Sequence, residues 1–147
     1  MKRVVVTGIG IVSCLGNNKK EVLNSLMNTK SGIIFSEEYK NYNFKSQVCG
    51  AIKINLDDYI DRKDKRFMGD GSAYNYIAMK EAINDAGLNE NEVSNEMSGI
   101  VMGSGGPSIK NVVHAVDSTR KSSPRKMGPF VVPRTMASTC SANLAVP

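Results

Sequence analysis

The chain has 147 residues, of which 41% are hydrophobic and 22% are charged, and this composition is typical of a globular domain. No apolar run approaches the roughly 18 residues of a membrane span, and the run Val4–Val6 is too short for the core of a signal peptide. The three cysteines are too widely spaced for a disulfide framework or a zinc site. We therefore expect a cytoplasmic protein without a membrane span.

The net charge of +5 is unevenly distributed along the sequence. Residues 1–66 and residues 110–147 each carry a net charge of +5, whereas residues 67–109 carry −5. Blocks of this kind form either solvated faces or a docking surface for an acidic partner. Because the basic blocks are interrupted by an acidic one, we expect no nucleic-acid partner.

The first half of the chain alternates predicted strands and helices. The β-branched run Val4–Thr7 predicts a buried strand. Asn18 has the spacing of a capping box and predicts the start of a helix that stops at Ser31–Gly32. A short strand is expected over residues 47–52, and residues 57–66 are charged and predict a helix.

The second half continues the same alternation. Ser72 is expected to cap a helix that ends at Ala86, with Gly87 as its stop and with an apolar stripe of Tyr76, Met79, Ile83 and Ala86. We expect a buried strand over 99–102, a flexible turn over 103–107, an exposed basic loop over 117–128 and a fully buried segment over 136–146. Strands that alternate with helices predict an α/β domain.

Two glycine-rich segments follow predicted strands, which is where α/β proteins place their sites. Gly8-Ile9-Gly10 resembles a dinucleotide-binding turn, but Ser13 replaces the third glycine, so the alternative of a tight structural turn stays open. Gly103–Gly106 forms either a structural turn or the wall of an active site. It lacks the lysine of a phosphate-binding loop.

The other candidate residues each have a structural alternative. Cys14, Cys49 and Cys140 lie among small or apolar residues, which favours buried and inert thiols. His114, the only histidine, is predicted to pack at an apolar edge and cannot form a metal site alone. Arg62 and Arg66, four residues apart on a predicted helix, form either a solvated face or a site for phosphate or carboxylate.

Taken together, the motifs resemble the β-ketoacyl-acyl-carrier-protein synthases. The resemblance keeps its order along the whole chain and is carried by Val4–Ser13 with Gly16–Asn18, Ser31–Ile33, Ile60–Lys63 with Arg66–Met68, Ala82–Leu88, Gly103–Gly106 and Gly128–Val132. The stretches Arg62–Met68 and Gly128–Val132 are more similar to the type I elongating enzyme than to the type II enzyme.

The resemblance implies a thiolase-like fold, in which two pseudo-repeated halves pack into an αβαβα sandwich that forms a homodimer. Residues 1–147 would be the N-terminal part of the N-terminal domain, cut before the nucleophile, and therefore an incomplete α/β sandwich that is inactive alone. The family transfers an acyl group to a cysteine and condenses it with malonyl-acyl carrier protein, without a metal or an organic cofactor. None of Cys14, Cys49, Cys140 or His114 matches a catalytic position of the family.

The resemblance therefore implies binding and interface residues in this chain rather than catalytic ones. Arg62, Lys63 and Arg66 match a docking face for acyl carrier protein, and Arg125 and Lys126 fall near a second basic patch. Residues expected beside the acyl pocket or the dimer interface are Gly105, Gly106 and Met136. A small nucleotide-binding or regulatory α/β module is the alternative function.

Overall fold

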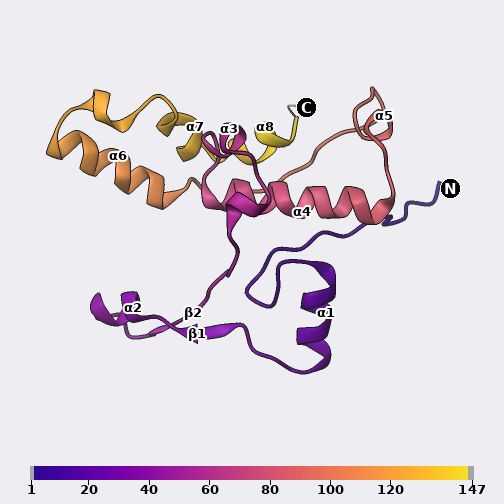
Figure 1. Ribbon diagram of the computed structural model, residues 1–147, viewed down its shortest axis with the longest axis horizontal. Coiled ribbons are helices and arrows are strands. Elements are labelled where there is room, and N and C mark those ends of the chain that lie inside the picture. The colour runs from indigo at the N-terminus through magenta and orange to yellow at the C-terminus, as the bar shows by residue number, and fades with distance from the viewer. Residues whose placement is uncertain (1, 146–147) are drawn as a thin grey trace.

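The computed structural model describes residues 2–145, which form an elongated molecule arranged around one long helix (Figure 1). In chain order the elements are α1 (Lys19–Met27), β1 (Ile33–Phe35), α2 (Glu37–Asn41), β2 (Val48–Gly50), the 3-10 helix η1 (Leu56–Asp58), α3 (Arg62–Lys65), α4 (Asp70–Ala86), α5 (Glu90–Val93), α6 (Ile109–Lys121), the 3-10 helix η2 (Pro124–Met127), α7 (Val131–Thr135) and α8 (Thr139–Ala145).

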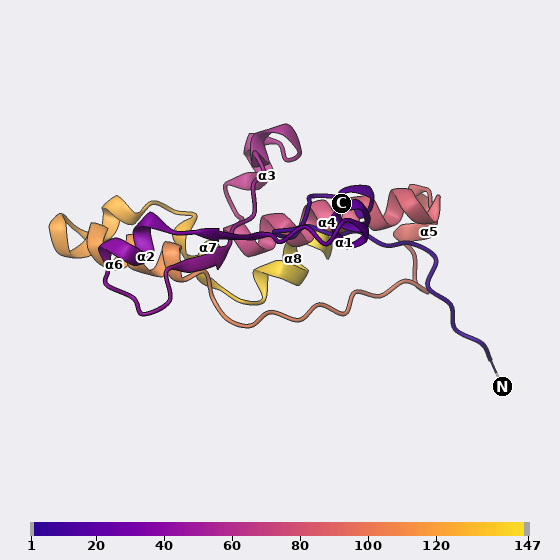
Figure 2. The same cartoon turned by 90° about the horizontal axis from the view of Figure 1, so that it is seen from below.

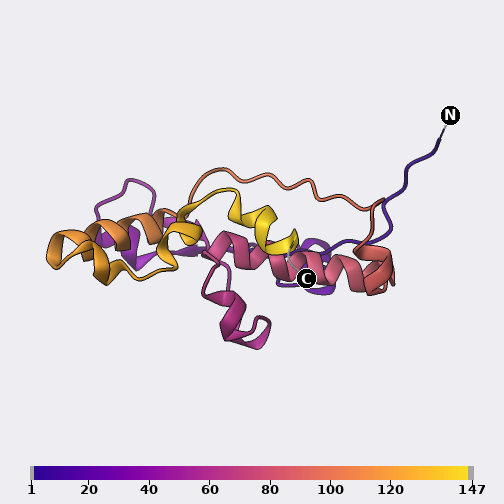
Figure 3. The same ribbon diagram turned by 90° about the horizontal axis from the view of Figure 1, so that it is seen from above.

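The long helix α4 organises the rest of the molecule. Helix α8 packs against it, and α6 contacts both η2 and α7. Figure 2 shows α3 projecting from one broad side of the molecule, while the extended stretch between α5 and α6 crosses the opposite side. Figure 3 gives the same arrangement from above. Strands β1 and β2 form an antiparallel pair in which Ile34 lies opposite Cys49.

The hydrophobic core is small and lies where α4 meets the segment before it. Its buried members are Ile60, Met68, Ala73 and Ile77, and partly buried side chains such as Val12 and Tyr76 pack around them. No large side chain within residues 2–145 is completely buried. The core therefore fixes the start of α4 and the position of α3, which lies between Ile60 and Met68 in the sequence.

Gly8 and Gly10 lie in an extended segment that packs directly on α4. A Cβ atom on Gly10 would overlap the carbonyl oxygen of Ala78 and lie 2.8 Å from the nitrogen of Ala82. A Cβ atom on Gly8 would overlap the carbonyl oxygen of Ala82 and lie 2.9 Å from the Cβ of Ala86. These glycines permit a helix and an extended chain to touch backbone to backbone. Both sequence interpretations are corrected, because the segment is no tight turn and α4 fills the space that a pyrophosphate would need.

Two carboxylates of α4 bind the backbone of the same extended segment. The N–H of Ile9 donates to Asp85 at 3.0 Å, and the N–H of Ile11 donates to Glu81 at 2.8 Å. The N–H of Lys19 donates to Glu81 at 2.7 Å, and the Lys19 ammonium pairs with Asp85. Hydrogen bonds from the Lys19 side chain and from the Ile9 N–H lower the pKa of the Asp85 carboxyl. The carboxylate pair Glu81 and Asp85 thus joins α4, the N-terminal segment and the start of α1.

The two predicted buried strands, Val4–Thr7 and 99–102, are corrected by the structure. Both segments are extended, but neither pairs with another strand among the described residues. The side chains of Val4 and Val101 are 94% and 101% exposed. A strand is stable only where its backbone groups find hydrogen-bond partners, and within residues 2–145 these two segments find no neighbouring strand.

Helix α4 confirms its predicted end but not its predicted start. Gly87 adopts the left-handed conformation, with φ at 69°, and ends the helix as expected. The helix begins at Asp70, and the predicted cap Ser72 lies inside it, where its hydroxyl donates to the carbonyl of Thr139 at 3.2 Å and accepts from Asn143 at 2.9 Å. The buried positions are Ser72, Ala73 and Ile77 rather than the predicted stripe, because α8 and the segment before α4 cover that side.

Other predicted boundaries are confirmed or shifted. The side chain of Asn18 caps α1, but the helix ends at Met27, four residues before the predicted stop. Residues 48–50 form the expected short strand, and residues 57–66 form η1 and α3 instead of one helix. The expected basic loop is helical up to Lys121, because α6 packs on η2 and α7.

The segment that was expected to be fully buried is only partly buried. Thr139 and Cys140 are buried against α4, but Met136 is 52% exposed. The segment forms a turn and then α8, of which one side faces α4. Val146, the last residue of the predicted segment, lies outside the described residues.

Candidate functional site

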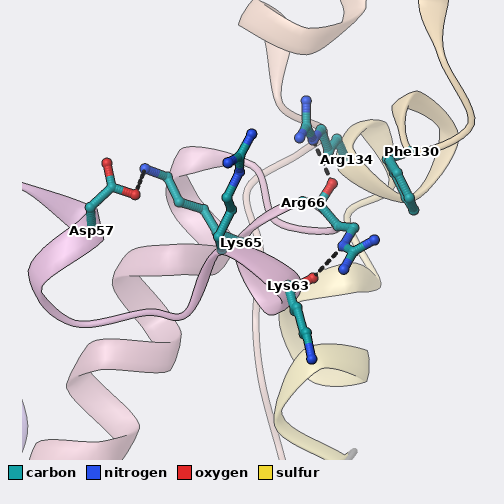
Figure 4. A pocket seen from close by; sticks show the side chains of 7 residues that line it. Asp57, Lys63, Lys65, Arg66, Phe130 and Arg134 are labelled. Atoms are coloured by element: carbon teal, nitrogen blue, oxygen red, sulfur yellow. Dashed lines mark hydrogen bonds and ion pairs between the residues drawn. The ribbon is translucent and has the colours of Figure 1, made fainter.

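A basic pocket lies where α3 approaches α7 (Figure 4). Residues from η1, from α3 and its end, and from the start and middle of α7 line it: Asp57, Arg62, Lys63, Lys65, Arg66, Phe130 and Arg134. Arg62, Lys63 and Arg66, which the sequence suggested as one cationic face, therefore line the same pocket. Phe130 and Arg134 come from more than sixty residues further along the chain.

The local structure explains why the arginines share one side. Helix α3 is a single turn, and Arg66 follows it with helical dihedral angles, φ −62° and ψ −23°. Arg62 and Arg66 therefore keep the i, i+4 relation of a helix although the assigned helix ends at Lys65. Met68, buried two residues later, anchors the end of this turn in the core.

The pocket has a strong excess of positive charge. Its single carboxylate, Asp57, pairs with the Lys65 ammonium at 2.7 Å. Arg62, Lys63, Arg66 and Arg134 form no ion pair with any residue of the described range 2–145. Four uncompensated cations around one depression favour an anionic partner, which carboxylates or a phosphate can provide.

Phe130 is the one aromatic residue that lines the pocket, and Phe67 packs against it. The rings of Phe67 and Phe130 meet edge to face with centroids 5.0 Å apart. The guanidinium of Arg66 lies 5.3 Å from the Phe130 centroid and 5.8 Å from the Phe67 centroid. This places a cation on aromatic faces, an arrangement that orders the arginine side chain.

Sequence reasoning missed Asp57 and Lys65 as lining residues, and it missed the two residues from the distant α7 region, Phe130 and Arg134. Arg134 donates from Nε to the backbone carbonyl of Arg66 at 2.7 Å. Arg134 is the only charged residue after Lys126. This isolated arginine in an uncharged stretch was the one feature of the sequence that could have indicated a functional role. Which cluster it joins depends on the approach of α7 to α3, which local sequence does not encode.

The remaining predicted site residues lie elsewhere. Arg125 and Lys126 are exposed on η2, between α6 and α7, and do not line the pocket. Gly105 and Gly106 are exposed in the loop before α6, where a Cβ on either would meet open space. Met136 follows α7.

The cysteines and the histidine form no reactive group in the described part of the chain. Cys14 lies against Gly50: a Cβ atom built on Gly50 would be 3.1 Å from the Cys14 sulfur. Because successive residues of a strand point to opposite faces, the side chain of Cys49 points to the other face of the strand pair. Cys140 is buried, His114 is exposed on α6, and no hydrogen bond joins them within residues 2–145. No group of three potential metal ligands occurs among the described residues. No helix among them has the length and apolar character needed to cross a membrane.

The fold superimposes on part of solved ketosynthase structures. A beta-ketoacyl synthase from Burkholderia phymatum superimposes with a TM-score of 0.83 at 24% identity, covering 99% of this chain and 36% of that structure. A type II polyketide ketosynthase, solved in complex with its acyl-carrier protein, superimposes with a TM-score of 0.76 at 19% identity, covering 99% of this chain and 38% of that one. The predicted fold class, an incomplete thiolase-like α/β fold, is thereby confirmed.

The sequence comparisons are more specific. Residues 1–147 match the family model of the beta-ketoacyl synthase N-terminal domain. The chain is 51% identical to 3-oxoacyl-[acyl-carrier-protein] synthase 1 of Haemophilus influenzae. The alignment covers 100% of this chain and 36% of the length of that relative. The chain belongs to the beta-ketoacyl synthase family, as its motifs predicted, and spans about a third of the length of the relative it matches. A separate nucleotide-binding module is therefore the wrong interpretation.

Proposed function

We propose that this chain forms the N-terminal part of a fatty-acid elongating enzyme that acts as a homodimer. The reaction would join a cysteine-bound acyl group to malonyl-acyl carrier protein. As carbon dioxide leaves, the malonyl carbanion attacks the acyl thioester carbonyl, and the cysteine thiolate leaves. The support is membership of the beta-ketoacyl synthase family together with the identity to a 3-oxoacyl-[acyl-carrier-protein] synthase.

Residues 1–147 would supply binding surfaces and framework rather than the nucleophile. Cys140 is buried, and Cys14 and Cys49 are half-buried beside the β1–β2 pair, without a hydrogen-bonded base among the described residues. A cysteine nucleophile needs an adjacent base or another source of thiolate stabilisation. The catalytic cysteine of the enzyme would lie outside these residues, as would the two histidines and the supporting lysine that the resemblance to the family implies.

The function of the basic pocket in this proposal is to dock acyl carrier protein. The observation that carries it is the set of four cations without ion-pair partners in the described range, three of which lie on one turn of chain at α3. An acidic protein surface would compensate these charges, and complementary charge accelerates association and fixes orientation. Arg125 and Lys126 on η2 would extend the basic surface. Gly105, Gly106 and Met136 would border the acyl chain or the second protomer.

Binding of this chain to an immobilised bacterial acyl carrier protein tests the docking proposal. The variant Arg62→Glu, Lys63→Glu, Arg66→Glu should bind at least about tenfold more weakly, because each exposed pair contributes about 0.2–1 kcal/mol and reversal adds repulsion. Added salt should weaken binding of the unmodified chain, since exposed charges are screened.

The matched control reverses three exposed lysines away from the pocket: Lys20→Glu, Lys30→Glu and Lys45→Glu. This variant has the same net charge as the pocket variant, so a difference between them reports position rather than total charge. Binding that falls equally in both variants would show a nonspecific electrostatic effect and would reject the pocket as the docking site.

A further inference from the structure

The three predicted docking cations that line the pocket differ in how firmly their side chains are held. Arg62 and Lys63 are exposed, and neither side chain makes a hydrogen bond within the described residues. Arg66 is half-buried, and its Nε donates to the carbonyl of Lys63 at 2.8 Å. The three cations therefore cannot contribute to binding in the same way.

Arg66 is held from α7 at two separate points. Its guanidinium lies 5.3 Å from the centroid of Phe130, which is the residue just before α7. Its backbone carbonyl accepts the hydrogen bond from Arg134, four residues later on the same side of α7. The edge-to-face contact of Phe67 with Phe130 closes the arrangement. Figure 4 shows Arg66 between Lys63 on one side and the α7 residues on the other.

This arrangement leaves the useful donors of Arg66 free. A guanidinium has one donor at Nε and four at its terminal nitrogens, and only Nε is hydrogen-bonded here within the described residues. The terminal N–H groups can therefore donate to both oxygens of a carboxylate as a bidentate pair. Because the side chain is already ordered, less conformational entropy is lost when the partner binds.

We propose that Arg66 is the specificity-determining contact of the pocket and that Phe130 and Arg134 are positioning residues that hold it ready for a carboxylate of an acidic protein. Arg62 and Lys63 steer the partner and act on the association rate, whereas the ordered Arg66 acts on the dissociation rate. The inference rests on the proposed carrier-protein docking, because the partner whose carboxylate Arg66 binds is the acyl carrier protein.

Kinetics on immobilised acyl carrier protein test this division of roles with a substitution that changes no charge. Phe130→Leu should raise the dissociation rate about 3- to 10-fold, the effect of losing one cation–π contact and an ordered arginine, with little change in association rate. Phe130→Tyr retains the ring and should keep the dissociation rate of the unmodified chain. Arg66→Lys keeps the charge but should dissociate as fast as Phe130→Leu, because lysine lacks the planar fork.

The control for Phe130→Leu is Phe35→Leu, because Phe35 is a second aromatic ring with a cation nearby: the Lys40 ammonium lies 5.9 Å from its centroid. Phe35 lies on β1, and its substitution should leave both rates unchanged. Circular dichroism identifies a Phe130 variant that has lost its helices, and Arg66→Lys then decides the matter alone.

The outcomes separate the two proposals. No binding by the unmodified chain rejects carrier docking and with it this inference. A second outcome is that the triple charge reversal abolishes binding while Arg66→Lys dissociates at the same rate as the unmodified chain. That result rejects only the positioning role. A Phe130→Leu variant that keeps its helices and dissociates like the unmodified chain rejects that role as well.

Discussion

Single glycines decide how closely the N-terminal segment approaches α4. At Gly10 a side chain would meet the backbone of Ala78 and Ala82, which cannot move without breaking helix geometry. At Gly71, inside the first turn of α4, a Cβ would meet nothing within 4 Å. Substitution by alanine should therefore affect the free energy of unfolding differently at these two glycines.

Gly10→Ala should lower the free energy of unfolding by about 1–3 kcal/mol, the usual effect of overpacking. Gly71→Ala should leave it unchanged or raise it by up to about 1 kcal/mol, because alanine loses less backbone entropy in a helix. Urea unfolding followed by circular dichroism measures both. Equal effects at the two positions would contradict the close packing of Gly10 on α4.

The spacing of the two carboxylates on helix α4 matches the spacing of the backbone N–H groups in the extended N-terminal segment. Glu81 and Asp85 are separated by one helical turn, a rise of about 6 Å, and the N–H groups of Ile9 and Ile11 are about 6.6 Å apart along an extended chain. Each carboxylate can therefore accept one N–H without distortion. The helix provides the hydrogen bonds that a neighbouring strand would otherwise provide.

The lowered pKa of Asp85 predicts how this contact depends on pH. Hydrogen bonds from Lys19 and from the Ile9 N–H lower the pKa below its ordinary value of 3.8. The stabilising contribution is thus present above pH 3.8 and is lost as the pH falls through the lowered native value. In two-dimensional NMR the Ile9 amide should shift with a midpoint below 3.8, and Lys19→Met should raise that midpoint. A midpoint of 3.8 or higher in the unmodified chain would disprove the contact.

At the scale of the whole molecule, two apolar extended segments are exposed, around Val5 and around Val101. Extended apolar segments with free backbone groups are sites of intermolecular pairing. The chain expressed alone should therefore self-associate as its concentration rises.

Val5→Lys together with Val101→Lys should increase the monomer fraction, because lysine blocks edge pairing. The control Met27→Lys with Met97→Lys adds the same charge at two exposed methionines outside those runs and should have a smaller effect. Sedimentation velocity over a concentration series measures the monomer fraction. An unmodified chain that stays monomeric over the whole concentration series would contradict the prediction.

Local rules of sequence were sufficient for several features. Asn18 as the cap of α1 and Gly87 as the left-handed stop of α4 follow from interactions within a few residues. The strand at 48–50 was predicted from its residues, but it forms by pairing with β1, whose Ile33 lies opposite Gly50. The ordered motifs were also sufficient to predict the family and the fold. Arg62, Lys63 and Arg66 came together because they lie on one turn of chain, whose geometry is set locally.

Only the tertiary structure decided which distant residues complete these features. Phe130 and Arg134 reach Arg66 from more than sixty residues away, and Gly10 meets Ala78 across a similar separation. Such contacts depend on how α7 and α4 pack, and no local propensity encodes that. Val4–Thr7 has the composition of a buried strand, yet its side chains are exposed. The composition gives only a preference for a buried strand, and among residues 2–145 no neighbouring strand pairs with this segment.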